Sequence, residues 1–178
     1  APDTFSHEMP EHRAPVRPSR RIIGNVQHLL EILDACEVHA TCFILGSVAE
    51  DFPALVREIA AAGHEIGTHG YGHRPVYTLK RREFQEDVRH SVQLLEDVAG
   101  APVIAHRAPY FSITSQDEWA FDALAEIGIQ VDASTFPLES RFYRFPGWAG
   151  AAEWPRYPYI RETEYGQLLE LPATTVRL

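Results

Sequence analysis

The sequence of 178 residues is poor in several features that identify particular classes of protein. Lys80 is its single lysine, and its 16 basic residues face 25 acidic ones, which gives a formal net charge of −9. The acidic balance and the scattered arginines give no electrostatic support for nucleic-acid binding. No apolar run is long enough to span a membrane as a helix. The first residues show no signal-peptide pattern.

Cysteine is equally scarce, since Cys36 and Cys42 are the only two. We expect Cys36 to close a helix and Cys42 to lie in a strand, both as small core residues rather than as a disulfide. Two such cysteines do not identify a redox compartment. What the chain does have is an apolar fraction of 45%, enough for the core of one sizeable domain. Residues 1–19, with four prolines, are expected to form an extended arm before it.

Apolar spacing predicts helices that alternate with short strands. The helices are expected at residues 20–37 (with Ser19 as the N-cap), 51–62, 78–99 and 115–126. The strands are expected at residues 40–45 (buried on both faces), 64–68, 102–105, 129–131 and 168–171. Residues 137–165 are rich in proline, glycine and aromatics and are interpreted as a long functional loop. This alternation predicts an α/β fold with a parallel sheet, either a (β/α) barrel or an open doubly wound sheet.

Two histidines, His69 and His73, lie at the end of the predicted strand 64–68. Imidazole is the commonest protein ligand for divalent metals, and two of them can supply half of a tetrahedral zinc shell. The intervening Gly70 and Gly72 allow a tight turn that aims both rings at one point. Alone, the pair also fits ordinary surface histidines, because the chain contains nine.

Polar residues also follow the next two predicted strands, and parallel strands place their carboxyl ends at one edge of a sheet. Arg107 suits the fixing of a carboxylate or an anionic substrate. The backbone N–H or the phenol of Tyr110 can face a developing oxyanion. Asp132 can orient a histidine or bind substrate. The alternatives are a plain salt bridge for Arg107 and a turn cap for Asp132.

The predicted loop 137–165 contains a group of aromatic residues. They are Phe142, Tyr143, Phe145, Trp148, Trp154, Tyr157 and Tyr159. Aromatic faces can stack on sugar rings, and we take Trp148 and Tyr110 as the candidate substrate-binding residues. The same aromatic residues also fit a small core within the loop.

Three ordered motifs carry a resemblance to a known family. Residues 40–46 (ATCFILG), 63–73 (GHEIGTHGYGH) and 107–110 (RAPY) resemble the NodB-homology polysaccharide deacetylases, carbohydrate esterase family four. Residues 107–114, 132–134 and 171–178 resemble the branch linked to bacterial exopolysaccharide and exosortase systems. The resemblance runs from about residue 20 to the last residue, so residues 20–178 are interpreted as a partial domain of this family.

This resemblance implies a distorted (β/α) barrel, here without its first and last strands, because the family's opening aspartate motif and closing histidine motif have no counterpart. It implies a divalent metal, zinc first and cobalt or nickel as alternatives, held by His69, His73 and an aspartate. Arg107 would position the base aspartate, the Tyr110 N–H would help to form the oxyanion hole, and Asp132 would tune a catalytic histidine. The implied reaction removes N-acetyl groups from an N-acetylated sugar polymer.

Two other functions stay open at this point. One is an allantoinase-like cyclic amide hydrolase, which His73 argues against because such relatives tend to lack the second histidine. The other is a non-catalytic carbohydrate-binding protein, which the missing aspartates favour. The bacterial cytoplasm or the cell envelope is the expected location, and the oligomeric state is undetermined. Exposed sheet edges lead us to expect that this chain alone is poorly soluble or oligomeric.

Overall fold

The computed structural model describes residues 19–137 and 154–175. Along the chain the elements are α1 (Arg21–Ala35), β1 (Thr41–Ile44), α2 (Gly46–Asp51), α3 (Pro53–Ala61), β2 (Glu65–Thr68), the 3-10 turn η1 (Val76–Thr78), α4 (Arg81–Ala99), β3 (Ala105–His106), the 3-10 turn η2 (Pro109–Phe111), α5 (Trp119–Ile127), β4 (Val131–Asp132), β5 (Tyr159–Thr163) and β6 (Gly166–Glu170). The strands form one sheet in the order β1-β2-β3-β4-β6-β5. All neighbours are parallel except β5 and β6, so the predicted α/β fold with a parallel sheet is confirmed.

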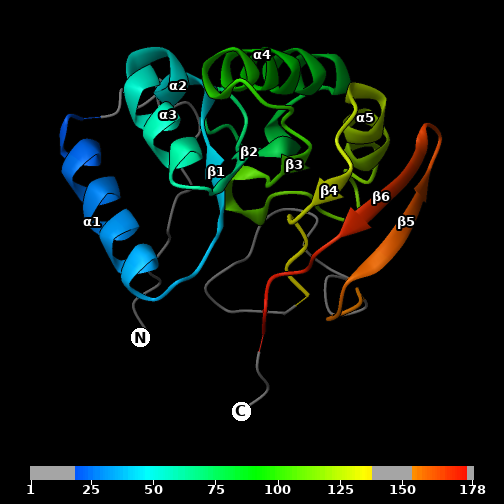
Figure 1. The fold of residues 1–178 in the computed structure, drawn as a ribbon. Helices are drawn as coiled ribbons and strands as arrows, with labels where there is room; N and C mark the ends of the chain where they lie inside the picture. The colour runs from blue at the N-terminus through cyan, green and yellow to red at the C-terminus, as the bar shows by residue number, and fades with distance from the viewer. Residues whose placement is uncertain (1–18, 138–153, 176–178) are drawn as a thin grey trace, which may run out of the picture.

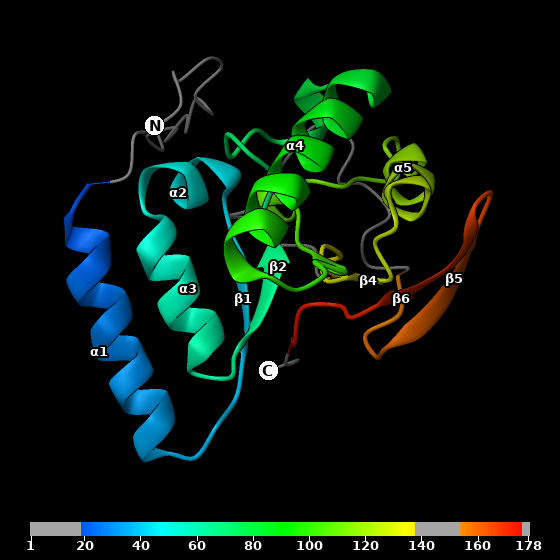
Figure 2. The same ribbon diagram turned by 45° about the horizontal axis from the view of Figure 1, so that its top comes forward.

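The sheet curves, and the helices arch around its outer side, with α1 on the far flank of α3 (Figures 1 and 2). Two apolar clusters fill the space between these layers. One joins α4, α5 and β6 and includes Phe84, Val88, Phe121, Leu124 and Leu168. The other joins α3, α4 and the first two strands and includes Ile44, Val56, Ile59, Ile66 and Leu95. The helix α4 contributes to both clusters and therefore ties the two halves of the molecule together.

The sequence of α4 explains its length and its position. Its buried residues recur every three or four positions: Phe84, Val88, Ser91 and Leu95. At its start the Glu83 carboxylate accepts the backbone N–H of Lys80 at 2.9 Å, and at its end Gly100 takes the left-handed conformation with φ +70°. The long helix therefore lies with one stripe against the sheet, and Ser91 is the polar residue of that stripe.

The structure corrects the prediction for the first helix and strand. The helix α1 buries none of its residues, and Leu29 is 47% exposed. Cys36 is exposed rather than a core residue, both cysteines are free, and Arg20, not Ser19, is the N-cap. The strand β1, at the edge of the described sheet, is not buried on both faces: Thr41 is exposed, Cys42 and Phe43 are half-buried, and only Ile44 is buried. Apolar spacing identified the helical face of α1, and Ile22, Val26 and Leu30 of that face pack half-buried against the core. Spacing alone does not show how completely a partner covers such a face.

Two further element predictions are wrong for local reasons. The helix expected at 51–62 is two helices, α2 and α3, which meet at Phe52 with φ −135° and ψ 57°. Pro53 follows directly, and the residue before a proline avoids the helical region. Residues 159–163 are strand β5, not loop, and the β5–β6 hairpin turns through two residues without the usual Asn-Gly signal.

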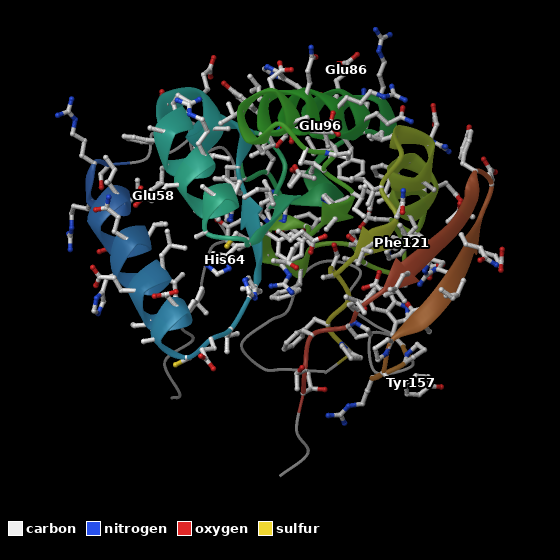
Figure 3. All side chains as sticks on the ribbon, in the orientation of Figure 1. Glu58, His64, Glu86, Glu96, Phe121 and Tyr157 are labelled. Atoms are coloured by element: carbon white, nitrogen blue, oxygen red, sulfur yellow. The ribbon has the colours of Figure 1, made fainter. Side chains whose placement is uncertain are left out.

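A hydrophobicity pattern also does not identify β5, because its inward face carries a charged residue. Arg161 points inward and lies 4.0 Å from the ring centroid of Phe121, while Ile160 on the other face is 52% exposed. Figure 3 labels Phe121 between α5 and the hairpin. A cation over an aromatic face replaces the aliphatic contact that alternation rules assume. No helix in residues 19–137 and 154–175 is long and apolar enough to cross a bilayer.

Candidate active site

The histidine pair lies where β2 ends. The ring centroids of His69 and His73 are 5.0 Å apart, with an angle of 60° between the planes. Gly70 adopts φ +73° and His73 adopts φ +57°. The left-handed conformation costs a residue with a side chain about 1 kcal/mol, so the fold bears a strain that brings the second ring toward the first.

His69 has the hydrogen bond that is typical of metal-binding histidines. Its Nδ1 lies 2.6 Å from the backbone carbonyl oxygen of Arg107. A carbonyl only accepts, so Nδ1 carries the proton and Nε2 presents its lone pair. Burial lowers the pKa of His69 to about 4 and also lowers the pKa of His73. Both rings are therefore neutral at pH 7, which is the form that binds a metal.

Arg107 follows β3 and lies beside this pair. Its guanidinium carbon is 4.5 Å from the ring centroid of Phe43, and its Nε donates to the carbonyl oxygen of Ala133 at 3.1 Å. No carboxylate lies within salt-bridge distance of Arg107 among the described residues. Within the described residues Arg107 therefore does not form the plain salt bridge that was the alternative interpretation. Its guanidinium is a half-buried cation at this edge of the sheet.

Tyr110 lies next to the second histidine. Its ring centroid is 4.6 Å from that of His73, its φ is +58°, and the residue is 41% exposed. In the described residues no backbone acceptor bonds the Tyr110 N–H. The exposed ring and the free N–H place a hydrogen-bond donor and an aromatic face beside the histidine pair. Trp148, the other predicted substrate-binding residue, lies outside the described residues.

Asp132 lies in a buried polar cluster behind this edge. Its Oδ1 is 2.6 Å from Nδ1 of His106 and accepts the Ser134 hydroxyl at 2.7 Å, while its Oδ2 accepts the Ser134 N–H at 3.1 Å. Asp132 thus both orients a histidine and caps the turn that follows β4. It is fully buried, and so is His106, so the pair acts from within the protein and not at its surface.

Sequence reasoning missed His106 and Glu170. The register aligns His106, Asp132 and Glu170 on three neighbouring strands, β3, β4 and β6. Glu170 Oε1 accepts the N–H and the hydroxyl of Thr135, at 2.9 and 2.7 Å. The strand expected at 102–105 ends one residue before His106. With β3 placed at its true position, the row of polar residues across the strands would have been the signal.

The protonation states of this row follow from its burial. Burial and the nearby Asp132 carboxylate raise the pKa of Glu170 to about 9, and burial raises the pKa of Asp132 to about 6. Burial lowers the pKa of His106 to about 3. At pH 7 the row therefore holds a neutral imidazole and one carboxyl proton, which Glu170 retains.

The described residues fit a divalent metal in part. His69 and His73 offer two neutral imidazoles at a short separation. Residues 19–137 and 154–175 contain no group of three or more histidine, cysteine, aspartate or glutamate residues that could hold a metal. The pair is therefore half of a tetrahedral ligand set.

Comparison with known proteins assigns the chain to a family. The sequence profile of the polysaccharide deacetylases matches residues 23–131. A peptidoglycan-N-acetylglucosamine deacetylase from Bacillus cereus is 31% identical over 119 residues, which cover 60% of this chain and 43% of the relative. A chitooligosaccharide deacetylase from Sinorhizobium fredii is 31% identical over 83 residues, or 46% of this chain and 39% of the relative. The chain thus spans less than half the length of these curated relatives.

Solved structures show the same fold. A crystal structure from Mycobacterium smegmatis, provisionally described as a polysaccharide deacetylase, matches with a TM-score of 0.69 and 29% identity, covering 86% of this chain and 46% of that one. A family 4 carbohydrate esterase from Streptomyces lividans matches with a TM-score of 0.56 and 26% identity, covering 65% and 56%. The Puue allantoinase matches with a TM-score of 0.64 at 20% identity, over 84% of this chain and 43% of that one, a likeness of fold alone.

Proposed function

Because this chain belongs to the polysaccharide deacetylase family, we propose that the protein removes N-acetyl groups from an N-acetylated sugar polymer by metal-assisted hydrolysis. The relatives named above are a peptidoglycan-N-acetylglucosamine deacetylase and a chitooligosaccharide deacetylase, and we extend this substrate class to the present chain. The observation that carries the proposal is the hydrogen bond from His69 Nδ1 to the Arg107 carbonyl, because it leaves Nε2 available as a metal ligand on a ring whose centroid is 5.0 Å from that of His73.

His69 and His73 would hold the metal, for which we propose zinc, with cobalt or nickel as alternatives. When bound, such an ion supplies a Lewis acid for the acetyl carbonyl and activates a water for attack. The chain's own contribution is to keep both imidazoles neutral and correctly turned. The buried side of His69 and the Arg107 carbonyl do this before any ligand arrives.

The remaining residues of the site would bind the substrate and orient the reacting groups. The Tyr110 N–H can donate to the oxyanion that develops on the acetyl carbonyl oxygen, an interaction whose loss typically costs about 10²–10³ in rate. The Arg107 guanidinium can hold a carboxylate, such as that of a base aspartate. The Tyr110 ring offers a face to a sugar, and we propose Trp148 as a second such face. Asp132 supports the site from behind through Ser134 and His106.

A second candidate is a carbohydrate-binding protein without catalytic activity on the same scaffold. The incomplete ligand set among the described residues favours it. For the deacetylase, the proposed setting is the bacterial exopolysaccharide system, in the cytoplasm or the cell envelope.

The test is metal content and acetate release. The full protein and its His69→Ala/His73→Ala variant are purified and analysed for zinc, cobalt and nickel, and then assayed on N-acetylglucosamine oligomers. We expect near-stoichiometric metal and acetate release in wild type and the loss of both in the double variant. His28→Ala, an exposed histidine on α1, is the matched control and should change neither.

Oligomer binding without metal or acetate release would overturn the deacetylase proposal and select the binding protein. Acetate release that survives the double variant would remove the histidines from the mechanism.

A further inference from the structure

The loop between the two histidines is held from behind by α4, the long helix that lies over β2 in Figures 1 and 2. Asp87 Oδ2 accepts the backbone N–H of Tyr71 at 2.7 Å, and the Ser91 hydroxyl donates to the carbonyl oxygen of Gly70 at 3.1 Å. Asp87 and Ser91 are four residues apart and therefore lie on the same face of the helix. Between them they bind both polar atoms of the Gly70–Tyr71 peptide unit.

The hydroxyl of Ser91 takes part in a closed local network. It accepts the Thr68 hydroxyl at 2.8 Å, and the Thr68 oxygen accepts the Gly70 N–H at 3.2 Å. Thr68 and Ser91 are fully buried. A buried hydroxyl without partners is costly, so a serine in the apolar stripe of α4 is stable only because the loop satisfies it.

The fit of the loop against α4 is close. A Cβ on Gly70 would lie 2.8 Å from Asp87 Oδ2, and Gly70 already needs φ +73°. The Gly70 carbonyl also accepts the backbone N–H of Gly46, at 3.0 Å, so α2 supports the loop from a second side. The Gly70–Tyr71 part of the loop is therefore bonded from two sides, by α2 and by α4.

We infer that Asp87 and Ser91 are positioning residues that fix the separation of His69 and His73 and so preorganise the metal pair. This inference rests on the proposed function. His69 is turned by the Arg107 carbonyl, whereas the ring of His73 depends on a strained backbone at φ +57°. The bonds from α4 maintain that strain. Groups that orient metal ligands without touching the metal typically contribute about 10–100-fold to metal affinity.

The test compares Asp87→Ala, Asp87→Asn and Ser91→Ala in the full protein. Zinc affinity is measured by competition with a chromophoric chelator, and the melting temperature is measured without metal. We expect Asp87→Ala to weaken zinc binding about 10-fold or more, because the Tyr71 N–H loses its acceptor. Asp87→Asn keeps an acceptor oxygen and should restore most of the affinity. Asp97→Ala, an exposed aspartate on the same helix, is the control.

Hydrogen–deuterium exchange gives a readout that needs no metal. We expect the segment 68–74 to exchange faster in Asp87→Ala and Ser91→Ala than in wild type, while the ends of α4 stay unchanged. A lower melting temperature with unchanged zinc affinity and unchanged exchange in this segment would make both residues structural and overturn the inference. Wild type without zinc affinity would overturn the proposed function and, with it, this inference; variants that bind zinc like wild type overturn the inference alone.

Discussion

The two chain segments that form the candidate site leave neighbouring parallel strands, yet different elements support them. The segment after β2 is bonded by side chains of α4, which lies outside the sheet. The segment after β3 is bonded by the next strand exit, where Ser134 Oγ accepts the Ala108 N–H at 2.8 Å and the Ala133 carbonyl accepts Arg107 Nε. The two supports meet at the hydrogen bond between His69 and the Arg107 carbonyl.

This difference has a chemical consequence. The support from α4 uses the buried hydroxyl of Ser91 and the carboxylate of Asp87, whereas the support from β4 uses a row of buried titratable groups. Asp132, His106 and Glu170 are all fully buried. We therefore expect the two supports to respond differently to mutation and to pH, even though both act on the pair of His69 and His73.

Asp132→Ala should have the largest effect on the β4 support. It removes the acceptor for both His106 Nδ1 and the Ser134 hydroxyl in a fully buried place. Leaving buried donors unpaired predicts a loss of about 3 kcal/mol or more in the free energy of unfolding. Urea unfolding measures it. A loss below that of Asp87→Ala would mean that α4, not β4, carries the stronger support.

Glu170→Gln tests the pH dependence of the same row. The pKa of Glu170 is raised from 4.5 to about 9, so the folded state holds a proton that the unfolded state has released. Stability is then highest below the unfolded value and falls as pH rises, until the folded group also ionises. The slope is at most about 1.4 kcal/mol per pH unit. The pKa of His106 is lowered to about 3, so below its ordinary value of 6.5 this residue makes stability rise with pH. The contribution of Glu170 is therefore measured between pH 6.5 and about 9.

In that window the wild type should lose stability with rising pH, and Glu170→Gln should not. Gln keeps an oxygen for the Thr135 N–H and adds no charge. Glu86→Gln on the exposed side of α4, labelled in Figure 3, is the control and should keep the wild-type slope. Chemical denaturation at several pH values reads the slope directly. An equal slope in wild type and Glu170→Gln would mean that Glu170 is ionised within the fold.

Ser134→Ala should have a smaller effect at the same turn. It removes the acceptor of the Ala108 N–H and one donor to Asp132, while His106 keeps its bond. One buried N–H without a partner predicts a loss of about 1–3 kcal/mol. Because Ala108 follows Arg107, we also expect weaker zinc binding through a less fixed Arg107 carbonyl. Unchanged zinc affinity at reduced stability would separate the β4 support from the histidine pair.

The sequence was sufficient for the parallel sheet and for the strand exits at His69 and Arg107, because apolar runs and glycine stops mark these elements. It was insufficient where the burial of a residue depends on which elements pack against it. The apolar stripe of α1 is real but only partly covered in the described structure, and β5 has Arg161 where alternation expects an aliphatic residue. Glu170 sits in an apolar run, and only the register shows that it neighbours Asp132. Local sequence patterns predict helices and strands. Which residues become neighbours across strands depends on the register of the sheet, which local patterns do not contain.

His90→Ala should have the smallest effect on stability and zinc affinity. It tests which contact of α4 positions the loop between the histidines. The exposed His90 ring stacks on Tyr71, with centroids 4.7 Å apart and an angle of 15°. Such a pair contributes about 0.5 kcal/mol when exposed, and its loss leaves the Tyr71 N–H bound to Asp87. We therefore expect a melting temperature close to wild type and unchanged zinc affinity. A drop in zinc affinity as large as that of Asp87→Ala would show that α4 positions the loop through the Tyr71 ring, and the carboxylate would then be the lesser contact.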